Sequence, residues 1–373
     1  SFPTRRSSDL KEIEEQIKRG AIQFLYVAPE RFENTFFLNL LRKIKIPLIA
    51  FDEAHCISKW GHDFRPSYQS VIQKVFTLPQ NFTIVALTAT ATAEVQQDIM
   101  SKLSIGQNDV VKTSTKRRNL IFKVNPTYQR QKFVVDYVAN HEGQAGIIYC
   151  STRKQVEELH EALNSEKIKS TIYHAGLTNK ERIEAQNDFL YDRVEVVIAT
   201  NAFGMGIDKS NVRYVIHYNM PGDLESYYQE AGRAGRDGLK SECILLFSER
   251  DKGLHEYFIT VSQADDDYKD KMGEKLTKMI QYTKTKKCLE ATIVHYFEPN
   301  ENLEECNQCS NCIQENKTYD MTREAKMIIS CIARMKQQEN YSVIIQVLRG
   351  EVTDYIKHHH YNELTTHRSE ERR

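Results

Sequence analysis

Two adjacent carboxylates in this chain have the residue types and the position to do phosphate chemistry. They belong to the tetrad Asp52-Glu53-Ala54-His55, which directly follows the apolar run 46–51. At the tip of a buried strand, one carboxylate can hold Mg²⁺ while the second aligns or deprotonates a water molecule. An isolated acidic pair is more often a solvated turn, so the tetrad alone is a weak signal. The phosphate cradle that such a site needs, Gly-x-x-x-x-Gly-Lys-[Ser/Thr], occurs nowhere in the 373 residues.

A threonine-rich segment, Thr88-Ala89-Thr90, follows a second apolar run at 82–87. Hydroxyl groups there could hydrogen-bond a neighbouring carboxylate and relay its state. The alternative is helix capping, with Thr90 or Thr92 starting a helix that runs through Met100. The two roles can coexist.

Two arginines three residues apart lie in the glycine-rich segment 229–238, which begins at Gln229. This spacing predicts that Arg233 and Arg236 share one face of a helix. An arginine presented across a cleft can neutralise charge on a phosphoryl group during its transfer. The alternative is a plain glycine-rich loop with surface arginines.

Four of the eight cysteines have the spacing C-x17-C-x2-C-x2-C. They are Cys288, Cys306, Cys309 and Cys312. Two short spacings with one distant partner predict a tetrahedral Zn²⁺ site. The other four cysteines are isolated, and we expect them to be small buried hydrophobic residues.

The segment 56–68 holds the only tryptophan, Trp60, together with Phe64, Arg65 and Tyr68. A loop that is aromatic and basic suits stacking on unpaired bases and contact with phosphates. Aromatic residues of an ordinary core are the alternative, but the polar residues interleaved here disfavour burial. The segment therefore predicts a surface that binds single-stranded nucleic acid.

Apolar runs that could form the strands positioning these residues recur along the first 250 residues. We expect strands at 22–27, 46–51, 82–87, 146–149, 194–199, 212–218 and 242–247. Their nearly continuous apolar character is typical of parallel strands covered on both faces. Amphipathic helical stretches lie between them, for example 155–163. The alternation predicts a parallel sheet with helices on both sides.

The composition is that of an ordinary soluble chain, with 40% hydrophobic and 27% charged residues and a formal net charge of zero. Nucleic-acid binding would therefore depend on local patches. No apolar run approaches the roughly 18 residues of a membrane span, and no secretory signal is visible. Residues 1–10 and 368–373 resemble translated adapter sequence, so we expect non-native flanks there, with ordinary disordered termini as the alternative.

Taken in order, these features resemble the RecQ family of superfamily 2 DNA helicases across residues 11–364. The segments that carry the resemblance are 26–31, 52–55, 56–68, 86–92, 148–153, 173–177, 197–208, 229–238 and the four zinc-site cysteines. The aromatic segment together with the four cysteines separates this family from DEAH-type RNA helicases.

The resemblance implies an α/β fold with two RecA-like parallel-sheet lobes, the first of them incomplete. A helical zinc-binding domain and a partial winged helix would follow. The implied domains are a partial first lobe at 11–112, a second lobe at 113–250, a helical hairpin with the zinc site at 251–316, and a partial winged helix at 317–367.

The resemblance also implies roles for individual residues. Asp52 would bind Mg²⁺, Glu53 would be the catalytic base, and Arg236 would be the arginine finger. His55 and Arg233 would complete the catalytic set, with Arg233 coupling its segment to the aromatic loop. Nucleotide-binding residues would be Gly206, Asp208 and Gln229. DNA-binding residues would be Trp60, His62, Phe64, Arg65, Ser151, Thr152, Arg153 and Thr200.

The implied activity is ATP-dependent 3′-to-5′ unwinding of DNA in repair and recombination, with ATP, Mg²⁺ and Zn²⁺ as cofactors. The expected partners are single-stranded DNA and duplex junctions. The expected protein is a monomer without a membrane segment, located in the cytoplasm and at the nucleoid in a bacterium. The sequence begins after the family's glutamine motif and phosphate cradle, so we expect no ATPase activity from these 373 residues alone.

Two alternatives remain open at this point. In the first, the chain is a DNA-binding zinc module without ATPase activity, which uses the stretch 269–287 with its seven lysines against two acidic residues. In the second, less favoured alternative, the chain is a DEAH-type RNA helicase.

Overall fold

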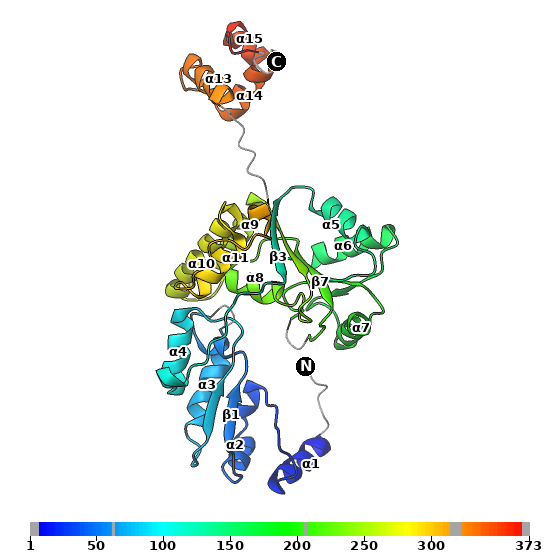
Figure 1. Cartoon of the computed structure of the whole chain (residues 1–373), viewed down its shortest axis with the longest axis vertical. Helices are drawn as coiled ribbons and strands as arrows, with labels where there is room; N and C mark the ends of the chain where they lie inside the picture. Colours follow the sequence, from blue (N-terminus) through cyan, green and yellow to red (C-terminus); the bar gives the residue numbers. More distant parts are fainter. Residues whose placement is uncertain (1–6, 62–63, 205–206, 314–321, 368–373) are drawn as a thin grey trace. The chain divides into compact units, whose positions relative to one another are not determined.

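The computed structural model describes residues 7–61, 64–204, 207–313 and 322–367, and side-chain burial from residue 12 onward. The chain divides into two compact units, Ser1–Gln314 and Glu315–Arg373. The first unit contains two parallel sheets and a helical region, and the second is helical (Figure 1). The parallel α/β class followed by helical regions confirms the predicted fold class.

The first sheet has two described parallel strands, β1 (Leu48–Phe51) and β2 (Thr83–Ala86). Leu48 pairs with Thr83, so the two strands end side by side. The helical elements of this lobe are α1 (Ser7–Lys18), η1 (Pro29–Glu33), α2 (Thr35–Leu41), η2 (Ala54–Ile57), α3 (Pro66–Val75), α4 (Ala93–Leu103) and η3 (Gln107–Asp109). Apolar residues of α2, α3 and α4 pack with Phe51 into one core.

The strand expected at 22–27 is wrong. The segment lies outside any strand, and the side chains of Phe24 and Tyr26 are 81% and 92% exposed. A strand needs a hydrogen-bonded neighbour, and the described ladder of this sheet joins only β1 to β2. Val27 alone of this run packs against the lobe's core. An apolar run therefore did not suffice to make a strand here.

The second sheet has six parallel strands in the order β3-β8-β7-β4-β6-β5. They are β3 (Leu120–Pro126), β4 (Ala145–Tyr149), β5 (Ser170–Tyr173), β6 (Val196–Ala199), β7 (Val212–His217) and β8 (Ser241–Phe247). Along β4, Ile147 and Tyr149 face one core while Ile148 faces another. Both faces are covered, as the continuous apolar runs predicted.

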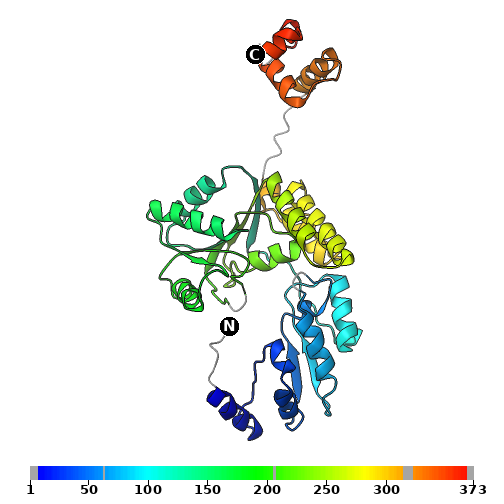
Figure 2. The ribbon, with the colours of Figure 1, turned by 180° about the vertical axis from the view of Figure 1, so that it is seen from behind.

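Helices cover the two faces of this sheet as separate groups, which Figure 1 and the reverse view in Figure 2 both show. Helices α5 (Arg130–Ala139) and α6 (Arg153–Ser165) pack on the face that includes Ile148. On the other face lie α7 (Asn179–Leu190) and α8 (Leu224–Ala231). The sequence analysis did not find β3 and β5. Both are edge strands with polar residues interleaved, so neither forms a continuous apolar run.

The helical region continues the core of the second lobe. It comprises α9 (Glu249–Val261), α10 (Asp266–Lys284), α11 (Leu289–Phe297) and α12 (Ser310–Ile313). Leu276 and Met279 of α10, and Leu289 and Phe297 of α11, are buried in the same cluster as the strand residues. Because the core is shared, the second lobe and the cysteine-bearing region form one packed body.

The second unit is a small helical body. Its elements are α13 (Thr322–Arg334), α14 (Tyr341–Arg349), α15 (Asp354–His358) and η4 (Tyr361–Glu363). Cys331, Met335, Val347 and Ile356 form its core. Residues 322–367 contain no strand. Across the described part of the chain, none of the helices combines the length and apolar character needed to cross a membrane.

Candidate functional site

The acidic tetrad lies at the carboxyl end of β1, where the sequence placed it. Phe51 is buried and Asp52 is exposed at the strand tip. Glu53 adopts the left-handed conformation, with φ 48° and ψ 47°. This backbone conformation costs a residue other than glycine about 1–2 kcal/mol, and such strain is concentrated at functional sites. Asp52 Oδ1 accepts a hydrogen bond of 2.9 Å from the Glu53 amide.

His55 joins the tetrad to the tip of β2. Its ring is buried, with Nδ1 3.3 Å from Glu53 Oε2 and 3.1 Å from the Thr88 hydroxyl. The Thr88 hydroxyl donates to the Thr90 carbonyl, 3.1 Å away, so His55 Nδ1 is the donor toward Thr88. The threonine therefore reaches the carboxylate through a histidine. Thr92 caps α4 by accepting from the Val95 amide, so the capping role also holds.

The aromatic segment continues directly from the tetrad. The Tyr68 hydroxyl donates to the Asp52 carbonyl at 3.1 Å, and burial raises the pKa of Tyr68. The Trp60 ring is half-buried, with the ammonium groups of Lys59 and Lys271 at 5.5 and 5.6 Å from its centroid. Phe64 and Arg65 are also half-buried, just before α3. His62 and Gly206 lie outside the described residues.

Four predicted DNA-binding residues lie at the edge of the second sheet that is formed by the carboxyl ends of its strands. Ser151 and Thr152 follow β4, and Thr200 follows the neighbouring strand β6. The Thr152 hydroxyl caps α6 by accepting from the Gln155 amide at 3.2 Å. Arg153, the first residue of α6, is exposed. This edge therefore presents hydroxyls, a guanidinium and helix amides, a set that suits phosphate.

A groove opens on the second lobe next to this edge. Its lining includes Tyr128, Gln155, Tyr218 and Asn219. Asn219 also accepts from the Ser151 amide at 3.0 Å, which links the groove to the predicted phosphate contacts. Tyr128 is exposed, and Gln155 and Tyr218 are half-buried. An aromatic and amide lining beside a phosphate-binding edge suits a nucleic-acid strand.

Arg233 and Arg236 do not share a helix face, which corrects the prediction. Helix α8 carries Gln229 but ends at Ala231, and both arginines lie in the segment 232–240 that follows, here called the arginine turn. Arg233 Nη1 donates to the Gly204 carbonyl at 2.6 Å. Arg236 Nη1 donates to the Ile207 carbonyl at 3.0 Å and to Asp208 Oδ1 at 2.8 Å.

Glycine determines the path of the arginine turn. Gly235 has φ +56°, and a Cβ atom there would lie 2.4 Å from Asn119 Nδ2. A side chain at this position would collide with its neighbours as well as strain the backbone. The arginines are therefore presented by a turn whose shape depends on glycine.

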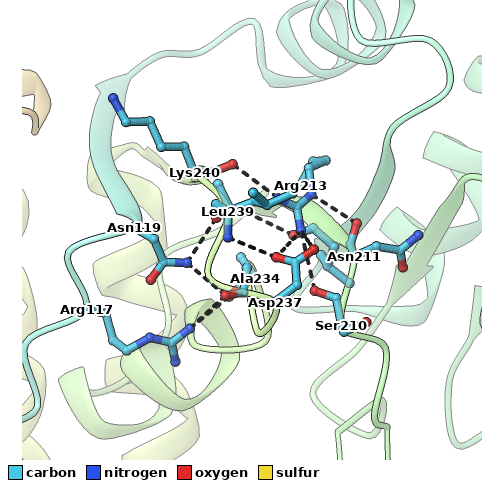
Figure 3. Close-up of polar contacts among 12 residues, drawn as sticks. Arg117, Asn119, Ser210, Asn211, Arg213, Ala234, Asp237, Leu239 and Lys240 are labelled. Atoms are coloured by element: carbon cyan, nitrogen blue, oxygen red, sulfur yellow. Dashed lines mark hydrogen bonds and ion pairs between the residues drawn. The ribbon is translucent and has the colours of Figure 1, made fainter.

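A polar network holds the arginine turn in place (Figure 3). Arg213 Nη2 lies 2.7 and 2.6 Å from the two carboxylate oxygens of Asp237, and the Arg213 side chain also donates to the carbonyls of Ser210, Asn211 and Lys240. Arg117 donates to the carbonyls of Ala234 and Gly235. Sequence reasoning missed this network, because its members are ordinary polar residues. The only signal was the basic segment 116–118, at the start of the second lobe.

The four predicted zinc ligands converge. Their sulfur atoms all lie within 4.8 Å of one another, and the Cys288–Cys309 and Cys306–Cys312 sulfur pairs are each 4.0 Å apart. Zn–S bonds of about 2.3 Å in a tetrahedron separate the sulfurs by about 3.8 Å. None of the four is in a disulfide. The donor set therefore fits Zn²⁺ in both number and spacing.

Local hydrogen bonds favour the thiolate form of Cys309, whereas the hydrogen bond with Cys309 raises the pKa of Cys288. The hydrogen bond between the Cys288 and Cys309 side chains, together with one from the Leu289 amide to Cys309, lowers the pKa of the Cys309 thiol to about 4. Burial raises the pKa of Cys306 to about 11. A bound cation would shift all four groups toward thiolate, the form that ligates zinc.

The cysteine cluster is attached to the edge strand β3. The Gln308 side chain donates to the carbonyls of Arg118 and Leu120 at 3.0 and 3.2 Å. The Val124 amide of β3 donates to the Ser310 hydroxyl. These contacts cover part of an edge that would otherwise expose unpaired backbone groups. The cluster thus stabilises the boundary of the second lobe.

Four family descriptions match successive parts of the chain. Residues 4–99 match the DEAD/DEAH box helicase family, and residues 129–238 match the helicase conserved C-terminal domain. Residues 249–313 match the RecQ zinc-binding family, and residues 315–369 match the RQC domain.

Curated relatives match almost the whole chain. It is 43% identical to the ATP-dependent DNA helicase RecQ of Bacillus subtilis over 98% of this chain and 61% of that protein. It is 35% identical to the protein of the same name from Pasteurella multocida, over 96% of this chain and 56% of that protein. For the Haemophilus influenzae protein the identity is 36%, over 91% and 54%. The chain therefore spans less than two thirds of the length of these relatives.

Proposed function

Because this chain belongs to the RecQ family of helicases, we propose that the whole protein uses ATP to unwind DNA in the 3′-to-5′ direction. We further propose that it acts as a monomer in repair and recombination, on single-stranded DNA and duplex junctions. Its proposed location is the cytoplasm, and the nucleoid in a bacterial cell.

One observation carries this proposal: the acidic tetrad and the aromatic segment are parts of one continuous structure. The Tyr68 hydroxyl is bonded to the Asp52 carbonyl, and η2 leads from the tetrad toward Trp60. A base stacked on Trp60 would therefore be bound by a loop that begins directly after the carboxylates proposed to act on phosphate. This arrangement supports ATP hydrolysis that depends on bound DNA.

In the proposed site, Asp52 would hold Mg²⁺ and Glu53 would accept a proton from the attacking water. When bound, ATP and Mg²⁺ supply the phosphoanhydride and the neutralising charge. The buried ring of His55 lies beside the carboxylate of Glu53, with Nδ1 3.3 Å from Oε2. Arg236 is proposed to neutralise charge during phosphoryl transfer, with Gln229, Gly206 and Asp208 on the nucleotide side. In the present structure Arg236 is bonded to Asp208, so it must exchange that partner for phosphate.

For DNA we propose a path that includes the Trp60 loop and the edge formed by Ser151, Thr152, Arg153 and Thr200.

The basic stretch 269–287 contributes less to the proposed DNA binding than its composition indicates. Lys275 is buried, and Lys271 and Lys284 pair with Glu94 and Glu249. Three of these lysines therefore lie beside acidic neighbours, and one of them, Lys275, is also shielded from solvent.

For the 373 residues themselves we propose DNA binding and structural zinc binding without ATP turnover. No residue run in the chain has the composition of a phosphate cradle. The carboxylates, the arginines and the DNA edge are present, but nothing with that motif holds the β- and γ-phosphates.

The test measures binding of a fluorescent single-stranded oligonucleotide across a salt series, alongside DNA-stimulated ATPase activity. We expect affinity to fall with salt, with a log–log slope of about −0.7 for each phosphate contacted, and no ATP turnover. A flat salt response would contradict the DNA proposal. ATP turnover that disappears in Glu53→Gln would contradict the proposed inactivity. An RNA oligonucleotide of the same sequence, bound more tightly than DNA, would favour the RNA helicase alternative.

A further inference from the structure

The ammonium group of Lys275 is buried where three elements meet. Lys275 belongs to α10 and is 7% exposed. Its Nζ donates to the Trp60 carbonyl at 2.8 Å and lies 3.0 Å from Glu225 Oε1. Trp60 belongs to the aromatic segment of the first lobe, and Glu225 lies in the first turn of α8. One cation therefore contacts both the proposed DNA-sensing loop and the helix that precedes the arginine turn.

The other contacts between α10 and the aromatic segment are more exposed. Lys59 lies 3.0 Å from Asp265 and 3.3 Å from Asp267, and all three side chains are at least a third exposed. Ion pairs in such positions contribute little, because water and salt screen them. A buried ammonium is different, since it is held in low dielectric and depends on its partners for solvation. Lys275 is thus the contact most sensitive to movement of the loop.

Helix α8 links Glu225 to the arginine turn. Glu225 is 2% exposed, and α8 ends six residues later at Ala231. Two residues further on, Arg233 donates to the Gly204 carbonyl. Tyr227 and Tyr228 hold the helix from the side: Tyr227 packs against Tyr282 of α10, and the Tyr228 hydroxyl donates to the Thr115 carbonyl between the lobes. A shift at Glu225 would therefore be carried along α8 to the arginines.

We propose that Lys275 is a positioning residue that couples the aromatic loop to the arginine turn through Glu225 and α8. This inference rests on the proposed function, because it assumes that the loop binds DNA. In this proposal, DNA binding moves the backbone of the aromatic loop, so that the Trp60 carbonyl leaves Lys275 and Glu225 becomes the principal partner of the ammonium. The ammonium of Lys275 therefore interacts differently with Glu225 of α8 when the loop is bound to DNA and when it is free. Coupling of this kind is reciprocal, so a shift of the arginine turn would also change the environment of Trp60.

The full 373-residue chain provides a reporter for each end of this connection. Trp60 is the only tryptophan, so its fluorescence reports the loop alone. Amide hydrogen exchange of residues 224–236 reports α8 and the arginine turn. In the wild-type chain we expect an oligothymidylate to change both signals. In Lys275→Met we expect the Trp60 signal still to respond, whereas the exchange response of 224–236 is lost.

Lys102 provides the matched control. It also donates to a carbonyl of the same loop, that of Ile57 at 3.1 Å, and pairs with a carboxylate, Asp98, at 2.9 Å. Both of its partners lie in the first lobe, so Lys102→Met loosens the loop without touching α8. We expect Lys102→Met to keep the exchange response of 224–236, and Lys275→Arg to restore it.

Removing Lys275 alone leaves the Glu225 charge buried without its cation, which could prevent folding. The double variant Lys275→Met/Glu225→Gln removes that charge as well and gives the same prediction. A Lys275→Met or double variant whose 224–236 peptide still responds to DNA would overturn the coupling, as would a wild-type chain that binds DNA without any response there. A wild-type chain that does not bind the oligothymidylate would overturn the proposed function and the inference together.

Discussion

The Nδ1 atom of His55 lies 3.1 Å from the hydroxyl of Thr88, although 33 residues separate them in the chain. The contact joins the tips of the two parallel strands, β1 and β2. It also orients a ring that approaches the Glu53 carboxylate to 3.3 Å. The carboxylate proposed as the catalytic base therefore lies beside a buried imidazole, and Thr88, which follows the neighbouring strand, contacts that imidazole.

The left-handed backbone of Glu53 gives the first prediction. Glu53→Gly and Glu53→Ala both remove the carboxylate, but only alanine keeps a Cβ atom at φ 48°. We expect the glycine variant to be the more stable of the two by about 1 kcal/mol, because left-handed backbone costs glycine almost nothing. Urea denaturation of both variants measures the difference.

The matching control is Gln97, an exposed residue within α4. There the order should reverse, with Gln97→Ala more stable than Gln97→Gly by about 0.5–1 kcal/mol. If alanine were also the better residue at position 53, the left-handed conformation would not be a feature of the protein in solution.

Much of the fold follows from the sequence by simple physics. Buried parallel strands are apolar along their whole length, so the runs that became β1, β2, β4, β6, β7 and β8 were recognisable. The edge strands β3 and β5 were not, because polar residues interrupt their apolar sequence. The run 22–27 shows the opposite error, since local apolar character cannot reveal whether a partner strand lies beside it.

The candidate site was predictable to a similar degree. The convergence of the four cysteines was predictable from their spacing, because the two short intervals keep Cys306, Cys309 and Cys312 close together. The position of Arg233 and Arg236 in a turn was not predictable from a three-residue spacing that also fits a helix. The pairing of Lys275 with Glu225 and the Trp60 carbonyl could not be predicted either. Such contacts depend on which helices pack together, and single-sequence patterns do not contain that information.

The second prediction concerns stacking on Trp60. We expect Trp60→Ala to weaken binding of single-stranded DNA by about 1–3 kcal/mol, the usual contribution of a base stacked on an aromatic ring. The salt dependence of binding should stay the same, because no phosphate contact is removed. Trp60→Phe keeps a stacking surface and should recover most of the affinity. Fluorescence anisotropy with a labelled oligonucleotide measures all three proteins. Equal losses for Ala and Phe would exclude stacking as the cause.

The third prediction is that zinc stabilises the first unit. Purified protein should contain about one equivalent of Zn²⁺, and a chelator should lower the melting temperature, because a metal that binds only the folded state adds its binding free energy to stability. Cys309→Ser should lose the metal. Cys243→Ser, at an isolated buried cysteine, should keep it even if the protein is destabilised. Full metal content in Cys309→Ser, measured by mass spectrometry, would contradict the four-cysteine site.

The last prediction uses pH to test the ion pair between Arg213 and Asp237 that holds the arginine turn. Hydrogen bonds from Arg213 hold the pKa of Asp237 below its ordinary value. A carboxyl group with a lowered pKa in the folded state stabilises the protein above its unfolded pKa, about 3.9, and this contribution is lost as the pH falls through the lower folded value. Asp237→Asn should therefore melt below the wild type at neutral pH, and the difference should shrink as the pH falls below about 4.

Asp208 provides the matched control for the ion pair between Arg213 and Asp237. It pairs with an arginine of the arginine turn, Arg236 at 2.8 Å, but its side chain is 88% exposed. Solvent screening makes such a pair nearly neutral for stability, so Asp208→Asn should follow the wild-type melting curve at every pH. If the curves of Asp237→Asn and the wild type ran parallel through the acidic range, Arg213 would not be acting on an ionised Asp237. The arginine turn would then depend on Gly235 and the backbone contacts from Arg117 and Asn119 for its shape.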